Sequence, residues 1–157
     1  MAANALFGPP VRAFTPGGAH VAVHLVPVFA GAVVAFDVSA RDARGRWLPW
    51  DLLPYGGNPY ETAAALGDDW CDGAVLDLAI IDALSFPLAG ESWELALVFR
   101  AGLAAAPGGD SDRTPVLLSG DALASISRFE AVDIARWLGE TAPAVPAPQR
   151  KGGDLLF

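Results

Sequence analysis

The sequence predicts a single domain of mixed α/β class in which strands outnumber helices. Its 157 residues are enough to enclose one hydrophobic core. Hydrophobic residues make up 53% of the chain and charged residues 18%, which excludes a disordered composition. The 17 glycines and 13 prolines often stand in pairs, so we expect frequent turns and few long helices.

The first part of the chain predicts a β-hairpin. Residues 19–29 and 32–39 are rich in valine, and an Ala-Gly pair separates them as a turn does. Asp37 interrupts the second apolar run and marks a strand end or a solvent-facing position. Before the hairpin, the Pro-Pro and Pro-Gly-Gly sequences of residues 1–18 predict an N-terminal arm.

A helix is expected to begin directly after Asn58. Asparagine is a preferred N-cap, Pro59 suits the first helical position, and Glu61 provides a carboxylate in the third. An alanine-rich run then continues the helix. We expect Gly67 to cut the helix short, and the Cys-Asp-Gly sequence at 71–73 to end it.

Further strands and a late helix are expected in the second half, each bounded by turn residues. The predicted segments are strand structure at 74–86 (one or two strands), strands at 92–103 and 116–119, a helical turn at 120–126, and a helix at 130–139. The domain then extends over residues 19–140, and the Pro/Ala-rich residues 141–157 form a C-terminal tail.

Charge and cysteine content exclude several classes of function. The net charge is −8 and no basic stripe is visible, so we expect no nucleic-acid partner. Cys71 is the single cysteine, which rules out an internal disulfide and predicts a buried, inert thiol. His20 and His24 share one face of a strand, but two histidines without a third ligand do not predict a metal site.

No membrane segment or leader is predicted. The longest apolar run, residues 21–36, is interrupted and is shorter than the roughly 20 residues that a spanning helix needs. The N-terminus lacks a basic region followed by an apolar core. We therefore expect a cytoplasmic protein without a membrane partner.

The stretch from Trp47 to Trp70 and the strand at 92–103 carry a resemblance to a known family. The residues concerned are Trp47, Leu53-Pro54, Gly56-Gly57, Glu61-Thr62-Ala63-Ala64-Ala65, and Leu95-Ala96-Leu97-Val98-Phe99-Arg100-Ala101. In this order, over residues 21–137, the chain resembles the Nudix hydrolase superfamily. The resemblance implies an α/β/α sandwich around a mixed central sheet.

The resemblance also implies a magnesium-dependent hydrolase of nucleoside diphosphate derivatives. In that family a glycine is followed after five residues by a glutamate, and after seven more by Arg-Glu and then a Glu-Glu pair on one helix. Those glutamates hold Mg²⁺, because a hard cation takes oxygen ligands, and water attacks the diphosphate. Here only three residues separate Gly57 from Glu61, and neither the Arg-Glu nor the Glu-Glu pair is present.

Three carboxylates remain as candidate catalytic residues and Mg²⁺ ligands: Glu61, Asp68 and Asp69. Glu61 and Asp68 are two helical turns apart and can share a face, with Asp69 about 80° further round. Each also has a structural interpretation, Glu61 as part of a helix cap and the aspartates as solvated residues near a helix end.

The candidate ligand-binding residues likewise have two interpretations. They are Trp47, Tyr55, Gly56, Gly57, Glu94 and Arg100. The glycines form a tight turn or a phosphate-approach loop, and the aromatic residues pack in the core or stack on a base. Glu94 and Arg100 share one strand face, which faces solvent or contacts a ligand.

Three functions follow from these alternatives. The first is a Nudix-like protein with a degenerate catalytic box, which retains a nucleotide-sized cleft and has weak or no pyrophosphohydrolase activity. The second is an active Mg²⁺-dependent hydrolase that uses Glu61, Asp68 and Asp69. The third is a non-catalytic homodimeric interaction module, based on an exposed tryptophan cluster and the apolar residues 155–157.

Overall fold

A computed structural model describes residues 18–40, 44–87, 92–123, 126 and 129–139 of the chain. The predicted N-terminal arm, except for its last residue, and the predicted C-terminal tail lie outside these described residues. No described helix is long and apolar enough to cross a membrane.

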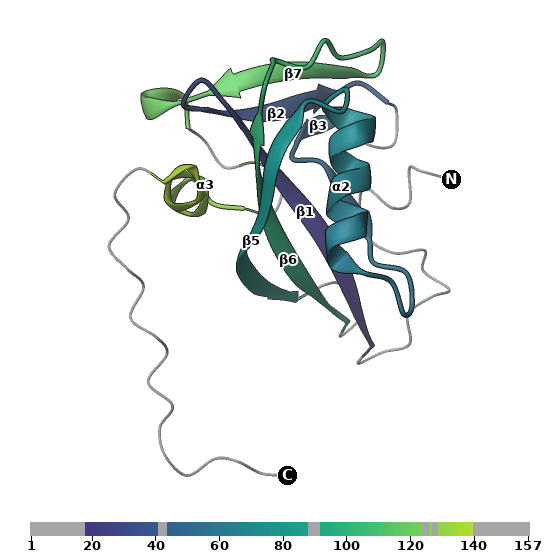
Figure 1. Cartoon of the computed structure of the whole chain (residues 1–157). Helices are drawn as coiled ribbons and strands as arrows, with labels where there is room; N and C mark the ends of the chain where they lie inside the picture. Colours follow the sequence, from purple (N-terminus) through teal and green to yellow (C-terminus); the bar gives the residue numbers. More distant parts are fainter. Residues whose placement is uncertain (1–17, 41–43, 88–91, 124–125, 127–128, 140–157) are drawn as a thin grey trace.

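One mixed, seven-stranded sheet forms the centre of the molecule (Figure 1). Its main path has the order β3-β2-β1-β6-β5, while β4 pairs with β1 and β7 pairs with β2. The strands are β1 (Ala19–Phe29), β2 (Ala32–Val38), β3 (Gly45–Trp47), β4 (Trp50–Leu52), β5 (Val75–Pro87), β6 (Trp93–Leu103) and β7 (Arg113–Leu118). The predicted mixed sheet is therefore confirmed.

The predicted hairpin is present as β1 and β2. Both residues of its turn have positive φ, 49° at Ala30 and 78° at Gly31, as the tight hairpin turns that match strand twist require. β1 also runs parallel to β6 over almost its whole length, with Ala19 opposite Trp93 and Val28 opposite Gly102.

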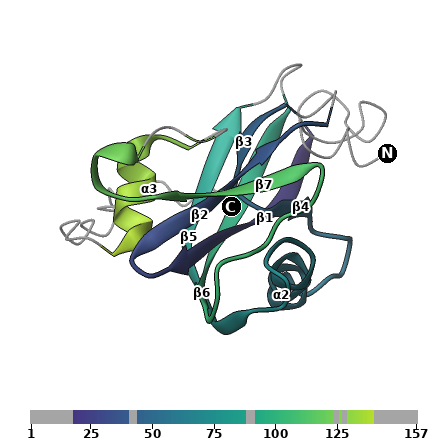
Figure 2. The ribbon, with the colours of Figure 1, turned by 90° about the horizontal axis from the view of Figure 1, so that it is seen from above.

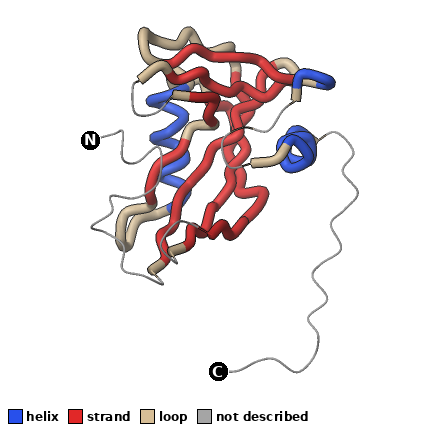
Figure 3. The backbone as a smooth tube through the Cα atoms, turned by 180° about the vertical axis from the view of Figure 1, so that it is seen from behind, coloured by secondary structure: helices blue, strands red, loops and turns tan. Residues whose placement is uncertain are grey.

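Two helices cover opposite faces of the sheet, α2 (Pro59–Trp70) and α3 (Ala131–Leu138), as Figure 2 shows from above. Strands dominate the backbone between them (Figure 3). One apolar cluster packs beneath α2 and includes Leu25, Phe36 and Phe99. A second lies beneath α3 and includes Val98 and Trp137. The predicted α/β/α sandwich is confirmed.

Helix α2 begins as predicted and, as predicted, ends at the Cys-Asp-Gly sequence, with Cys71 as its C-cap. The Asn58 side chain accepts a hydrogen bond from the Tyr60 backbone N–H at 2.9 Å, and Pro59 opens the helix. The prediction that Gly67 cuts the helix short is wrong, because the helix runs on to Trp70. A Cβ at Gly67 would lie only 2.5 Å from Cγ2 of Val75, so glycine permits close packing of α2 on β5.

The second half of the chain contains its predicted elements, but β7 (Arg113–Leu118) begins three residues before the predicted strand at 116–119. The run at 74–86 forms one strand, β5, which pairs with β6 and is irregular between Ile80 and Asp82. A short 3-10 turn, η3 (Gly120–Ala122), follows β7. Helix α3 ends at Gly139, whose φ of 85° is the left-handed value of a helix C-cap.

Candidate functional site

A groove runs along α2 on the side that faces β4 and β7. It consists of two adjoining cavities of about 430 and 400 Å³, which share Asp51, Leu66 and Asp69 in their walls. The larger cavity is also lined by the rings of Trp50 and Trp70. Asp51 could not be identified as a groove residue from the sequence, because β4 places it there through its pairing with β1.

Two of the three predicted catalytic carboxylates line this groove. Glu61 and Asp69 both border the smaller cavity. They are eight residues apart, which corresponds to about 12 Å along a helix. Asp68 is exposed and is not among the lining residues of either cavity; its Oδ1 lies 3.6 Å from where a Cβ on Gly73 would be. The helix therefore separates the three carboxylates.

Asp69 is engaged by a basic residue from a distant strand. Nη1 of Arg113, at the start of β7, donates to Oδ2 of Asp69 at 3.1 Å. The Arg113 guanidinium also lies over the Trp70 ring, 3.9 Å from its centroid. Asp110 holds the preceding loop by accepting from the Arg113 backbone N–H at 2.9 Å. A positive charge is thereby fixed beside the last turn of α2, where the helix dipole favours it.

The predicted Mg²⁺ ligands do not fit one ion in this arrangement. Mg²⁺ requires near-octahedral oxygen ligands at about 2.1 Å. Among the described residues, no group of three or more histidine, cysteine, aspartate or glutamate side chains is placed to hold a metal ion. The spread of Glu61, Asp68 and Asp69 along α2, together with the ion pair of Asp69, is consistent with this result.

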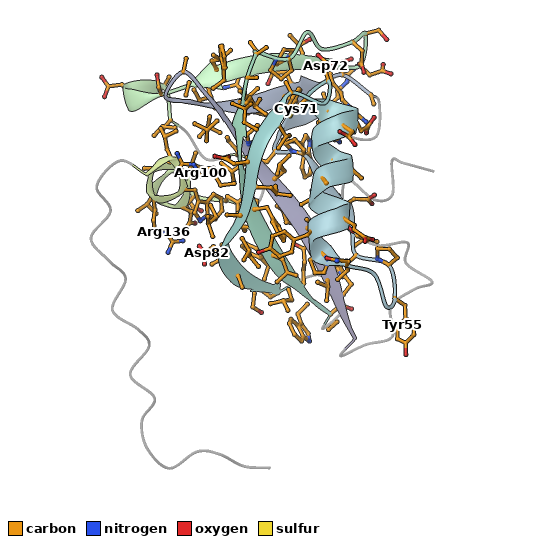
Figure 4. All side chains as sticks on the ribbon, in the orientation of Figure 1. Tyr55, Cys71, Asp72, Asp82, Arg100 and Arg136 are labelled. Atoms are coloured by element: carbon orange, nitrogen blue, oxygen red, sulfur yellow. The ribbon has the colours of Figure 1, made fainter. Side chains whose placement is uncertain are left out.

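The Gly-Gly loop lies near the groove but turns its aromatic residue outward. The backbone N–H of Gly57 donates to the carbonyl of Pro54 at 2.8 Å and closes a tight turn. Gly56 has a φ of 71°, which favours glycine. Tyr55 is fully exposed at the outer end of this loop (Figure 4). The turn interpretation of the two glycines is therefore confirmed.

The predicted exposed tryptophan cluster is wrong. Trp47, Trp50 and Trp70 are all less than 9% exposed and belong to the apolar cluster beneath α2. The rings of Trp47 and Trp50 stack at a centroid distance of 6.4 Å. Trp50 and Trp70 line the groove although they are largely buried, and Trp47 is a core residue.

Glu94 lies on the opposite face of the sheet from the groove, and the prediction that it faces solvent is wrong. It is completely buried on β6. Nε2 of His20 lies 3.1 Å from its Oε1, and Nε2 of His24 lies 3.3 Å from its Oε2. The His24 ring also makes an edge contact with Phe129 at 4.9 Å. We call this group the His–Glu–His cluster.

Arg100 shares the face of Glu94, as the strand alternation predicts, and is likewise remote from the groove. Its Nη1 is 3.1 Å from where a Cβ on Gly139 would lie, so the guanidinium sits at the C-terminal end of α3 (Figure 4). A cation at this end of a helix is favourable. Of the six predicted ligand-binding residues, Glu94 and Arg100 thus belong to the α3 side of the molecule.

The single cysteine is buried, as predicted. Burial, and to a smaller extent the neighbouring Asp72 carboxylate, raises the pKa of the Cys71 thiol to about 12. The nucleophilic form is a thiolate, so this side chain is unreactive in the folded protein.

No protein-family model matches the sequence. No curated protein matches it either. Solved structures do match, at low sequence identity, and such matches speak for the fold alone.

Three of these structures cover most of both chains. A MutT protein from Methanosarcina mazei Go1 has a TM-score of 0.62 and 13% identity, and the match covers 79% of this chain and 96% of that one. A NUDIX hydrolase from Nitrosomonas europaea has a TM-score of 0.60 at 12% identity, covering 80% and 89%. A Bacillus subtilis pyrophosphohydrolase has a TM-score of 0.55 at 16% identity, covering 85% and 87%.

A further match is partial. It is an ADP compounds hydrolase, of which this chain covers 56%, at 14% identity and a TM-score of 0.47. That superposition is too limited to carry an argument.

Proposed function

Because the chain has the Nudix hydrolase fold, we propose that it binds a nucleotide-type small molecule in the groove along α2, with weak or no pyrophosphohydrolase activity. The observation that carries the proposal is the groove itself. Its larger cavity, about 430 Å³, has the size of a small-molecule site. The carboxylates on α2 that would have to share one Mg²⁺ are spread along the helix instead.

The walls of the groove combine apolar and acidic side chains. Trp50, Leu66 and Trp70 supply apolar contact, while Asp51 and Asp112 add negative charge at the rim. Arg113 is the basic residue among the described residues that line it, and it is already paired with Asp69. A phosphorylated ligand therefore has to bring its own counter-cation, so its affinity should rise with Mg²⁺ concentration.

Calorimetric titration tests this proposal. The folded protein is titrated with a panel of nucleoside diphosphate derivatives, with and without Mg²⁺. We expect at least one member to bind, and more tightly with Mg²⁺. No binding by any member of the panel would refute the nucleotide site.

A matched pair of variants locates the ligand. Ala64 and Ala65 are adjacent, exposed residues of α2, but only Ala65 lines the smaller cavity. Ala65→Trp should fill the groove and weaken binding at least tenfold, and Ala64→Trp should leave the affinity unchanged. Equal effects of the two substitutions would place the ligand elsewhere.

An active Mg²⁺-dependent hydrolase is the second candidate function. It is favoured by one observation, that Glu61 and Asp69 line the same cavity. Release of nucleoside monophosphate, followed by chromatography, measures the activity. The double variant Asp68→Asn, Asp69→Asn should abolish any turnover if these residues hold the metal, and unchanged turnover would reject that assignment.

The cytoplasmic location expected from the sequence is a separate part of the proposal. Fractionation of cells that produce the tagged protein tests it, and recovery outside the soluble cytoplasmic fraction would contradict it.

A further inference from the structure

Helix α2 covers only part of the sheet face on which it lies. Near its end, Gly67 packs against Leu25 and Val75. At its start, the Tyr60 ring meets the buried ring of Phe99 at 4.9 Å. Strands β1, β5 and β6 continue beyond Phe99, away from the helix, toward the lower end of the sheet in Figure 4.

The part of this face that no described residue covers is apolar. Because side chains alternate along a strand, Trp93, Leu95 and Leu97 of β6 point to the same side as Phe99. The exposed fractions are 40% for Trp93, 44% for Ile80 and 48% for Tyr60.

The register of the strands makes these residues contiguous. Leu95 lies between Val21 of β1 and Ser85 of β5, and Leu97 is opposite Ala83 of β5. We define the apolar face by six residues: Val21, Tyr60, Ile80, Trp93, Leu95 and Leu97.

No charged side chain lies on this face among the described residues of β1, β5 and β6. The positions that point to it on β5 are Ile80, Ala83 and Ser85. The whole chain carries a net charge of −8, so two copies repel each other over most of their surfaces. An uncharged patch is where that repulsion is smallest, and it gives a charged partner nothing to pair with. The chemistry therefore favours an identical apolar face as the occupant.

The area of the patch sets the strength of such a contact. Three strands span about 14 Å across, and the seven residues from Trp93 to Phe99 span about 20 Å along the strand. Two such patches bury on the order of 600 Å², which is below the roughly 1,200–2,000 Å² of a standard stable interface and in the size range of weak, transient encounters. This area corresponds to a weak, reversible association.

We propose that the apolar face is the interface of a weak homodimer, in which two copies pack sheet against sheet through the same residues. The two sheets would bury Leu95 and Leu97 at the centre, with Trp93 and Tyr60 toward the ends. The interface is separate from the groove, which lies on the other side of α2 and is lined by Glu61 and Asp69. The homodimer is therefore independent of the proposed nucleotide site.

Sedimentation equilibrium over a wide range of protein concentrations tests the dimer. The wild-type chain should shift from monomer toward dimer as the concentration rises. Trp93→Glu should remain monomeric. Val132→Glu is the matched control, since Val132 is 73% exposed on α3, on the opposite side of the sheet. It should dimerise like the wild type. A wild-type monomer at the highest soluble concentration, or equal dimerisation of both variants, would overturn the proposal.

Cross-linking provides a second test that tolerates a misfolded Trp93→Glu variant. Cys71 is the only natural cysteine and is buried, so Ser85→Cys introduces the one accessible thiol. A short bismaleimide should join two Ser85→Cys chains, and should not join two Val132→Cys chains. Absence of the cross-link would count against the interface. A Ser85→Cys thiol that also resists a small maleimide would show that another segment of the same chain covers this face, which overturns the dimer.

Discussion

Glu61 at the start of α2 and Glu94 on β6 flank the same sheet, but only Glu94 is withdrawn from water. Glu61 is exposed at the rim of the groove. Glu94 is fully buried, and each of its oxygens lies within hydrogen-bonding distance of one histidine. The carboxylates on the α2 side are available to a ligand, and the carboxylate on the other side is committed to the fold.

The difference shows that residue type does not identify a site in this chain. A buried charge is retained only with close hydrogen-bonding partners, and removing one partner is costly. An exposed carboxylate carries no such constraint and contributes little to stability. The two regions also touch, because Trp50 lines the groove and its ring stacks on His24 at 5.8 Å. Substitutions that separate stability from binding should therefore divide along the two faces.

The largest effect is expected from Glu94→Ala. The substitution leaves two buried imidazole groups without the carboxylate and creates a cavity, so the free energy of unfolding should fall by roughly 3–5 kcal/mol. Urea denaturation followed by circular dichroism measures it. Asp68→Ala, an exposed residue on α2, is the control and should change the value by less than about 0.5 kcal/mol. Similar urea midpoints for Glu94→Ala and Asp68→Ala would contradict the view that Glu94 is committed to the fold and Asp68 is not.

A smaller loss is expected from Asp82→Ala, which weakens the attachment of α3. Oδ2 of Asp82 accepts from Nε1 of Trp137 at 2.9 Å and also from Arg136 (Figure 4). The Asp82 side chain is only 19% exposed. Loss of these bonds should cost about 2 kcal/mol. Denaturant titration checks this value, with the exposed Asp121→Ala as the control. A cost equal to that of the control would show that α3 docks without this carboxylate.

On the groove side, the pairing of Asp69 with Arg113 should contribute less than about 1 kcal/mol, because the Asp69 side chain is 65% exposed. A double-mutant cycle of Asp69→Asn with Arg113→Gln measures the coupling, which should disappear at high salt. The same cycle with Asp68→Asn should give no coupling. Coupling of Asp68 to Arg113 would mean that the two aspartates are not separated as described.

The smallest effect concerns acid stability at the sheet edge. Hydrogen bonds from the Arg46 side chain lower the pKa of Asp37 below its usual 3.8, despite an opposing contribution from burial. A lowered pKa stabilises the fold above the unfolded value, and this contribution is lost as the pH falls through the folded value. The pair is partly exposed, so it should contribute less than about 1 kcal/mol.

The test is the pH dependence of the urea midpoint below about pH 5. Asp37→Asn should flatten part of the acid-induced decrease seen in the wild type. An identical pH profile for the two proteins would show that the Arg46 contact adds nothing to stability.

Local chemistry made the start of α2 predictable. An asparagine cap followed by proline acts within one helical turn, and the Asn58 side chain does accept from Tyr60. The continuation of α2 past Gly67 was not predictable, because glycine has a low intrinsic helix propensity. The close approach of Gly67 to Val75 is a tertiary contact, which overrides propensity.

The site was only partly predictable for a similar reason. Strand alternation predicts that Glu94 and Arg100 share one face of their strand, and that His20 and His24 share one face of theirs. It could not show that these faces coincide in the folded sheet, because that depends on the parallel register between β1 and β6. In the same way, the ion pair of Asp69 depends on Arg113, 44 positions later in the chain.

The pairing of β1 with β6 also has a consequence for how the chain is made. His20 and Glu94 are neighbours in the sheet but 74 positions apart in sequence. The ribosome synthesises the chain from the N-terminus to the C-terminus, so β1 is complete long before β6 emerges from the ribosome. Until then the central strand lacks its longest pairing, and closing so long a loop slows folding. Synthesis of this protein should therefore pass through a stage in which the valine-rich β1 depends on rapid completion of the chain to avoid aggregation.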